Sequence, residues 1–379
     1  MGVELLLLPL PARLFAFLLL NAFLVAWARA TSWWLPPGLP RLLAASPIFA
    51  ATFLAPALFD PAKEIILYDY CVVCYLWLVN WKVAGLALDR GPLVGRRGGE
   101  GTPPVVFAAL LLLPVNIRAG KGGRDGGADA EGAKGARWSK SGGTTKDFLM
   151  RGSLKVCLVT TLAYITLKIW DRFPLLRDVA LVWILFFMVS MVMDVLASIS
   201  IAVLNLELMP HFERPWLCTS LSDFWGSRWN LVVGKMLRDM IYWPICEGRF
   251  VGRPGTKGVT TGHSHATHAR QAIGVLATFV VSGVMHALLI MYISGAFGWK
   301  NLLYFVVNGC AVLGERLAKD TVGRKKAVRN VMARIPAWMR TVYTLGFLHV
   351  TSHFLFWPEV LDMSSDVINT INVFVPGAR

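Results

Sequence analysis

The chain has 379 residues, of which 55% are hydrophobic and only 16% are charged. Soluble domains carry about 25% charged residues, so this composition, with a mean hydropathy of +0.55, indicates an integral membrane protein. The net charge is +15, but the basic residues lie in loops between apolar segments. This distribution indicates that the basic residues orient the chain in the membrane or contact an anionic cofactor. With no helix-turn-helix or zinc-finger pattern, it argues against nucleic acid as a partner.

Apolar segments long enough to cross a membrane follow one another along the chain, since a spanning helix needs about 20 residues. The predicted spans are 5–28, 41–59, 64–88, 152–170, 178–205, 271–294, 299–317 and 341–357. The first is expected to be a retained span, because Glu4 precedes it in place of a basic signal-peptide region. A ninth stretch, 104–117, is short and has prolines at both ends, so we expect a re-entrant segment or a compact span.

The predicted fold class is therefore an all-α polytopic membrane protein of about eight transmembrane helices, with residues 1–379 forming one domain. When the loop after the third span is placed in the cytosol, most Lys and Arg fall on the cytosolic side, as the positive-inside rule expects. Residues 119–146 are rich in Gly, Ala and Lys and are predicted to be a flexible cytosolic loop. Residues 207–270 are expected to be cytosolic or interfacial. Within them, 231–253 is predicted to be an interfacial helix that Pro244 breaks or kinks.

A histidine inside the predicted span 271–294 is the first candidate catalytic residue. His286 has apolar flanks for more than two helical turns on either side. A neutral imidazole that faces a cavity can accept the proton of a hydroxyl group. The alternative is a structural histidine that bonds to a neighbouring helix.

The second candidate is the aromatic segment 220–230, which reads Ser-Leu-Ser-Asp-Phe-Trp-Gly-Ser-Arg-Trp-Asn. The amide of Asn230 can donate to a developing oxyanion, and the fork of Arg228 matches phosphate oxygens. Trp225 and Trp229 either line an acyl channel or anchor the chain at the membrane interface.

Three further features suggest metal or transport chemistry. The tract from His263 to His268 matches no helical metal-binding spacing and has no acidic or thiol ligand nearby, so we expect a solvated loop and no metal site. Asp194 lies inside a predicted span, where we expect it to pair with Lys155 or Lys168, or to bond to a serine. His349 and His353 share one helix face and are expected to pack near Trp357.

The segment 219–231 resembles the signature of plant wax ester synthases, the long-chain-alcohol O-fatty-acyltransferases of the membrane-bound O-acyltransferase superfamily. Four more segments are similar to the same family and follow one another in the same order, namely 80–82, 91–93, 210–217 and 281–286. The resemblance therefore covers nearly the whole chain. Two positions depart from it. The family usually has arginine where Ser227 stands and commonly has glutamate where Ala287 stands.

The resemblance implies the family's helical bundle and acyl transfer from long-chain acyl-CoA to a fatty alcohol at the endoplasmic reticulum membrane, with acyl-CoA as co-substrate and no cofactor. It implies that His286 is the catalytic base and that Asn230 acts beside the thioester. The predicted substrate-binding residues are Asp223, Phe224, Trp225, Arg228, Trp229, Lys235 and Arg238. A sterol acceptor is the nearest alternative. Alternatives of another class are a transporter, which would use Asp194, His286 and the His349 face, and an inactive scaffold.

Overall fold

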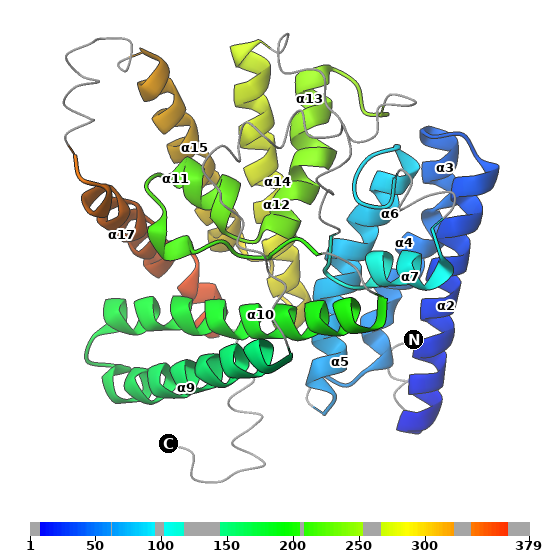
Figure 1. The fold of residues 1–379 in the computed structure, drawn as a ribbon, viewed down its shortest axis with the longest axis horizontal. Coiled ribbons are helices and arrows are strands. Elements are labelled where there is room, and N and C mark those ends of the chain that lie inside the picture. The colour runs from blue at the N-terminus through cyan, green and yellow to red at the C-terminus, as the bar shows by residue number, and fades with distance from the viewer. Residues whose placement is uncertain are drawn as a thin grey trace.

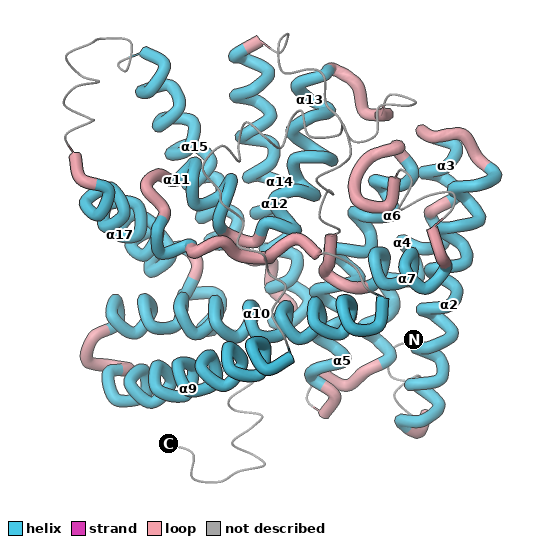
Figure 2. Tube along the Cα trace, in the orientation of Figure 1, coloured by secondary structure: helices cyan, strands magenta, loops and turns pink. Residues whose placement is uncertain are grey.

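The computed structural model describes residues 8–61, 63–94, 102–116, 145–204, 208–252, 267–321 and 335–362. Regular structure in these residues is almost all helical, which confirms the predicted fold class (Figures 1 and 2). The α-helices are α2 (Leu10–Trp34), α3 (Leu39–Ala44), α4 (Ser46–Leu54), α5 (Ile65–Tyr70), α6 (Asn80–Ala87), α7 (Pro104–Leu112), α9 (Thr145–Ile169), α10 (Pro174–Leu204), α11 (Leu221–Asp223), α12 (Leu231–Leu237), α13 (Trp243–Glu247), α14 (His268–Ser294), α15 (Trp299–Thr321) and α17 (Ala337–Leu355). The predicted loop 119–146, except its last two residues, and His263 and His265 lie outside the described residues.

Six helical segments of the described chain are long and apolar enough to cross a membrane. They are Leu10–Trp34, Leu39–Leu58, Ile65–Ala87, Gly152–Ile169, Pro174–Leu196 and His268–Ser294. They agree with six of the eight predicted spans. The other two predicted spans are helical as α15 and α17 but are not among these six, so the count of eight is not confirmed. Helix α7 has nine residues and is about 13 Å long at about 1.5 Å per residue, too short to cross alone.

Large apolar side chains cover the outer faces of several of these helices. Leu18 on α2 is 65% exposed and Leu167 on α9 is 72% exposed. A water-soluble protein rarely exposes contiguous apolar faces of this kind. Lipid tails would cover them in a bilayer, as expected for a multi-pass membrane protein.

The N-terminal helices are held together by cations that bind within the protein. Lys82, only 1% exposed, donates from Nζ to the carbonyl oxygens of Leu110 and Leu113, at 2.7 and 2.5 Å. It thus satisfies carbonyl groups at the end of α7, where helices leave acceptors without partners. Arg13 makes a two-pronged ion pair with Glu64, with both N–O distances at 2.8 Å.

Helices α9 and α10 lie side by side and run crosswise to α14 in Figure 1. Lys155 of α9 donates to the carboxylate of Asp194 and to the hydroxyl of Ser190, both on α10. This confirms the prediction that Asp194 pairs across helices. The acid is therefore part of a structural contact between two helices.

The segment 231–247 is a helix with a widened turn in its middle. Helix α12 continues into the π-helix η5 (Arg238–Tyr242) and then into α13, whose second residue is Pro244. Proline has no backbone N–H and clashes with the preceding turn of an α-helix. The π-helix lies directly before Pro244 and accommodates the missing hydrogen bond. The predicted break or kink at Pro244 is therefore seen as a local change from α-helix to π-helix.

Helices α14 and α15 approach closely at glycine residues. A Cβ atom at Gly309 would lie 2.8 Å from Cβ of Phe279, and one at Gly283 would lie 3.0 Å from the carbonyl oxygen of Leu302. Such distances are too short for any side chain, so these glycines set the spacing between the helices. The spacing also fixes the place of α14, which carries His286.

Gly309→Ala should therefore destabilise the protein by about 1–3 kcal/mol through overpacking against Phe279. Gly314→Ala is the matched control on the same helix, because a Cβ there meets no atom within 4 Å. That change should be neutral or stabilise by up to about 1 kcal/mol. Thermal unfolding of the purified protein in detergent measures both, and equal shifts in Tm would contradict the close approach at Gly309.

Candidate active site

The first half of the motif segment, residues 220–230, is folded by bonds among its own residues. The hydroxyl of Ser220 accepts a hydrogen bond from the backbone N–H of Asp223 at 3.0 Å and so caps α11. The π-helix η4 (Phe224–Arg228) follows and ends where the backbone N–H of Trp229 donates to the Phe224 carbonyl oxygen. Serine is a preferred N-cap residue, so the local sequence supports this turn.

Asn230 ends the motif segment in a left-handed conformation, with φ +41°. Its Oδ1 accepts a hydrogen bond from the backbone N–H of Val233 at 3.3 Å and caps α12. Asparagine suits both tasks, because it tolerates the left-handed region and is a strong N-cap. The bond through Oδ1 leaves the amide N–H₂ group to donate to another partner.

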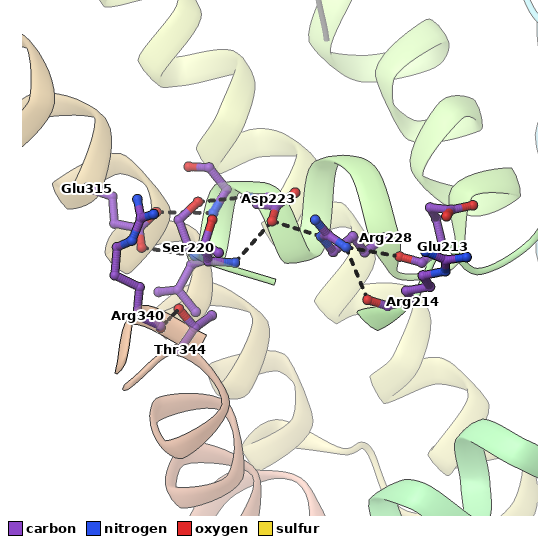
Figure 3. A network of polar contacts seen from close by, with 11 residues as sticks. Glu213, Arg214, Ser220, Asp223, Arg228, Glu315, Arg340 and Thr344 are labelled. Carbon is purple, nitrogen blue, oxygen red and sulfur yellow. Dashed lines mark hydrogen bonds and ion pairs between the residues drawn. The ribbon is translucent and has the colours of Figure 1, made fainter. Parts of the chain in front are cut away.

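A carboxylate from a distant part of the chain holds the motif segment in place. Glu315 of α15 accepts hydrogen bonds from the backbone N–H groups of Leu221 and Ser222, at 2.9 and 3.1 Å (Figure 3). These groups are at the start of α11, where a helix has donors without internal partners. Glu315 therefore ties the motif segment to α15.

Asp223 and Arg228 form the other part of this network. Asp223 Oδ2 accepts from Nε of Arg228 at 2.8 Å and from the backbone N–H of Thr219 at 3.0 Å (Figure 3). Nη1 of Arg228 also donates to the carbonyl oxygens of Glu213 and Arg214. The structure thus places both predicted substrate-binding residues in the scaffold of the motif and outside the lining of the two cavities described below.

Lys235 and Arg238, the other two basic residues predicted to bind substrate, lie in different surroundings. Lys235 forms an ion pair with Asp239 at 3.4 Å and does not line either cavity. Arg238 donates from Nη1 to the carbonyl oxygen of Gly226 at 2.8 Å and lines the larger cavity. Arg238 therefore remains a candidate for substrate contact.

His286 is oriented by its own helix and by two aromatic rings. Its Nδ1 lies 2.7 Å from the carbonyl oxygen of Ser282. A carbonyl oxygen only accepts, so Nδ1 carries the proton, and the neutral ring keeps its lone pair on Nε2. Phe305 stacks on the ring with centroids 4.2 Å apart, and Trp77 packs edge-on at 4.7 Å. Nε2 is therefore the nitrogen that can take a proton.

The larger cavity, which we call the first cavity, has a volume of about 240 Å³ and lies between the motif segment, α12, η5, α14 and α15. It brings together His286, Asn230 and Trp225. Arg238 and Arg316 are also in its lining, and none of the described lining residues is acidic. The first cavity thus joins the two predicted catalytic residues to a positively charged wall.

The second cavity has a volume of about 120 Å³ and lies between α10, α15, α17 and the motif segment. Its described lining is apolar and aromatic, with no Asp, Glu, Lys or Arg side chain. His286, Trp225, Trp229 and Phe305 line both cavities. His286 therefore stands between a cavity with a basic wall and an uncharged one.

The three predicted aromatic residues of the motif segment line these cavities. Phe224 lies in the second cavity, and Trp225 and Trp229 lie in both. Trp225 also donates from its indole N–H to Oδ1 of Asn308 at 3.2 Å. The structure thus favours the cavity-lining interpretation of the two tryptophans over interfacial anchoring.

The two histidines of α17 have different surroundings. Nδ1 of His353 lies 2.7 Å from Oδ2 of Asp178, a buried residue of α10. His349 lines the second cavity together with Trp357, as predicted from their expected packing. Within the described residues, no group is hydrogen-bonded to His349 Nδ1, and no cluster of three metal-binding side chains occurs.

Ala287, one of the two departures from the family pattern, is fully buried. Its carbonyl oxygen accepts from the backbone N–H of Gly298 at 3.3 Å, and a Cβ at Gly298 would lie 3.2 Å from the Ala287 Cα. The loop at Gly298 therefore packs directly on this position. A glutamate here would need that loop to move.

Four residues of the site are absent from the sequence-based prediction. They are Trp77, Phe305, Glu315 and Arg316. Trp77 and Phe305 lie in apolar runs without any distinguishing neighbour, so the sequence carries no signal for them. The adjacent charges of Glu315 and Arg316 near the end of a predicted span were a usable signal, because charge is rare within lipid.

Glu315→Ala should loosen the motif segment and make Cys218 reactive. Burial, with a smaller effect of Asp223, raises the pKa of Cys218 to about 11, so about a thousandth of the thiol is ionised at pH 8. Cys218 is also fully buried. Alkylation at pH 8 should therefore be slow in the native protein, become faster towards pH 11, and be at least several-fold faster at pH 8 in the variant, as measured by mass spectrometry of the peptide.

Glu359→Ala is the matched control, because Glu359 accepts from the backbone N–H groups of Lys300 and Asn301 at the other end of α15. That change should lower Tm without speeding the alkylation of Cys218. Equal alkylation rates in both variants would mean that Glu315 does not hold the motif segment.

Comparison with known proteins agrees with this arrangement. Residues 208–307, which include Asn230, His286 and Phe305, match the membrane bound O-acyl transferase family. The chain is 28% identical over 354 residues to the acyl-CoA–sterol O-acyltransferase 1 of Arabidopsis thaliana, and the alignment covers 91% of this chain and 90% of that protein.

Two long-chain-alcohol acyltransferases are also similar. The Simmondsia chinensis long-chain-alcohol O-fatty-acyltransferase is 28% identical over 302 residues, covering 77% of this chain and 74% of that protein. The probable long-chain-alcohol O-fatty-acyltransferase 7 of Arabidopsis thaliana is 34% identical over 178 residues, which are 46% of this chain and 47% of that protein. The chain is therefore an acyltransferase that is similar, over most of its length, to the wax synthase group of the membrane-bound O-acyltransferases.

Proposed function

We propose that the protein transfers a long-chain acyl group from acyl-CoA to the hydroxyl group of a long-chain alcohol and forms a wax ester. The observation that carries this proposal is the place of His286 between two cavities of different chemistry. One cavity suits an anionic acyl donor and the other suits an uncharged lipid.

The first cavity is the proposed site of the acyl-CoA. Arg238 and Arg316 in its lining supply positive charge for the phosphates of coenzyme A, and guanidinium groups match phosphate oxygens well. Its remaining lining is mainly apolar and aromatic, which suits the start of an acyl chain. The thioester then lies near His286 and Asn230.

The second cavity is the proposed site of the alcohol. A fatty alcohol is uncharged and has one polar group, and the described lining offers aromatic and aliphatic contacts without a full charge. The alcohol would approach His286 from the side of α10 and α17. Donor and acceptor then meet at the imidazole from opposite cavities.

In the proposed reaction Nε2 of His286 takes the proton of the alcohol, and the alcohol oxygen attacks the thioester carbonyl carbon. Asn230 donates from its amide to the carbonyl oxygen as negative charge develops there. The tetrahedral intermediate collapses, the carbon–sulfur bond breaks, and the coenzyme A thiolate receives the proton from the imidazolium. Direct attack needs no redox or electron-sink chemistry, so we propose acyl-CoA as co-substrate with no further cofactor.

A sterol is the second candidate acceptor. It is favoured by the similarity over 91% of this chain to a protein named as an acyl-CoA–sterol O-acyltransferase. The mechanism stays the same with this acceptor. We propose the endoplasmic reticulum membrane as the place of the reaction in either case, which co-localisation of a tagged chain with a marker of that membrane tests.

His286→Ala should abolish ester formation, because loss of a general base typically costs about 10²–10⁴-fold in rate. The chain is expressed in a yeast strain that makes no storage esters, fatty alcohol is supplied, and neutral lipids are analysed. His268→Ala, at the exposed first position of the same helix, is the control and should keep full activity.

Wax esters from the native chain and none from His286→Ala would support the proposed function. Steryl esters in place of wax esters would change the acceptor and keep the mechanism. Absence of any new ester, with the native protein present in the membrane, would contradict the proposed function.

Arg316→Gln should raise KM for acyl-CoA by about 10-fold or more, because a charge-assisted hydrogen bond contributes about 1.5–3 kcal/mol. KM for the alcohol should stay the same, since Arg316 lines the first cavity and not the second. Initial rates in microsomes at varied acyl-CoA and alcohol concentrations measure both constants. A larger change in KM for the alcohol would reverse the assignment of the two cavities.

A further inference from the structure

Trp77 offers a second hydrogen-bond donor beside His286. Its ring centroid lies 4.7 Å from that of the imidazole, and the residue lines the first cavity together with Asn230. The side chain comes from the π-helix η2 (Cys71–Val79) in the N-terminal half of the chain. The family match, in contrast, covers residues 208–307 and does not reach it.

The indole N–H of Trp77 has no partner within the described residues, although the side chain is buried and 6% exposed. An indole nitrogen only donates, so it needs an acceptor to be satisfied. A buried donor without an acceptor is costly, and native proteins rarely keep one. An acceptor supplied by the substrate would explain why this donor stays in the cavity wall.

The surroundings of Trp77 hold it firmly. It packs in one apolar cluster with Leu78, Met236 and Met240, which joins η2 to α12 and η5. Five residues further along, Lys82 is bound to the end of α7. The donor is thus fixed relative to His286 before substrate binds, which is the condition for stabilising developing charge efficiently.

The reaction has an acceptor that fits this donor. Attack on the thioester turns the carbonyl oxygen into an oxyanion, which accepts more than one hydrogen bond. His286 cannot supply one at this step, because its Nδ1 proton is bound to the Ser282 carbonyl oxygen and its Nε2 is receiving the alcohol proton. Two donors of the first cavity lining are candidates for this oxygen. They are the amide of Asn230 and the indole of Trp77, whose ring packs against the imidazole.

We propose that the indole N–H of Trp77 binds the thioester carbonyl oxygen and stabilises the oxyanion together with Asn230. This inference rests on the proposed acyl transfer. Both halves of the chain then contribute to the site. His286 and Asn230 come from residues 208–307, and Trp77 comes from η2. Trp77 acts as a catalytic residue because it touches a reacting atom.

The test uses Trp77→Phe, which keeps an aromatic ring in the cluster and removes the N–H group. Removing one donor to an oxyanion typically lowers kcat by about 10²–10³-fold, and we expect a loss of this size with KM for the alcohol changed less than about two-fold. Trp81→Phe is the matched control. Trp81 lies in the same helical stretch and the same cluster but does not line the first cavity, so that variant should keep wild-type kcat.

Two inhibitors distinguish a hydrogen bond from the indole N–H of Trp77 from mere packing of its ring. A 2-oxoalkyl-coenzyme A keeps the carbonyl group without a cleavable thioester, and an S-alkyl-coenzyme A of the same length has no carbonyl oxygen. Trp77→Phe should weaken the binding of the 2-oxoalkyl-coenzyme A at least about 10-fold and leave the binding of the S-alkyl-coenzyme A unchanged. Equal weakening of both would assign Trp77 to packing and overturn the proposal, as would a kcat above half of the wild-type value.

These outcomes differ from a failure of the proposed function. If the wild-type chain forms no ester, acyl transfer itself is contradicted. If the wild-type chain forms ester and Trp77→Phe forms it equally fast, acyl transfer stands and the role of Trp77 is rejected.

Discussion

Polar groups of this chain that lie within the apolar helices must find their partners inside the protein, because lipid supplies no hydrogen bonds. Lys82 binds two carbonyl oxygens at the end of α7, and Lys155 binds Asp194 and Ser190 between α9 and α10. These pairs fix how the helices sit against one another. Trp77 is an exception to this rule, because its indole N–H has no partner in the described protein, and the residue lines the first cavity.

The motif segment is held from several sides. Its own Ser220 and Asn230 cap the two short helices, and Asp223 binds Arg228. Glu315 then fixes the start of the segment to α15. The same helix α15 carries Phe305, which stacks on His286. One helix thus positions both the aromatic motif and the imidazole, and the spacing between α14 and α15 depends on glycines that leave no room for a side chain.

The candidate site combines a histidine that has no carboxylate in the described cavity lining with two cavities, of which only the first is lined by arginines. The hydrogen bond from His286 Nδ1 to a backbone carbonyl sets the tautomer. No acidic group is present in the described lining of either cavity, so in the proposed reaction no carboxylate competes with His286 for the proton of the hydroxyl group. Ala287, the residue after His286, is fully buried, and the loop at Gly298 packs on it. This position therefore has no room for the glutamate that is common in the family. In the proposed complex the arginines of the first cavity would face the charge of the acyl donor.

The amino-acid sequence by itself determined the membrane class, six of the spans and the resemblance to the acyltransferases, and it singled out His286, Asn230 and the motif tryptophans, which the structure places around one cavity. Hydropathy, spacing and local motifs are properties of short segments, which is why they can be read directly. It also singled out Arg228 and Asp223, whose charges suggested substrate contact, but whether a charge faces a ligand or a partner depends on what folds against it. Only the tertiary structure decided that these two residues bind each other and that Glu315 holds the motif. It also placed Trp77, more than 200 residues away in the chain, next to His286. Such contacts arise from the packing of distant helices, for which the residues themselves carry no local signal.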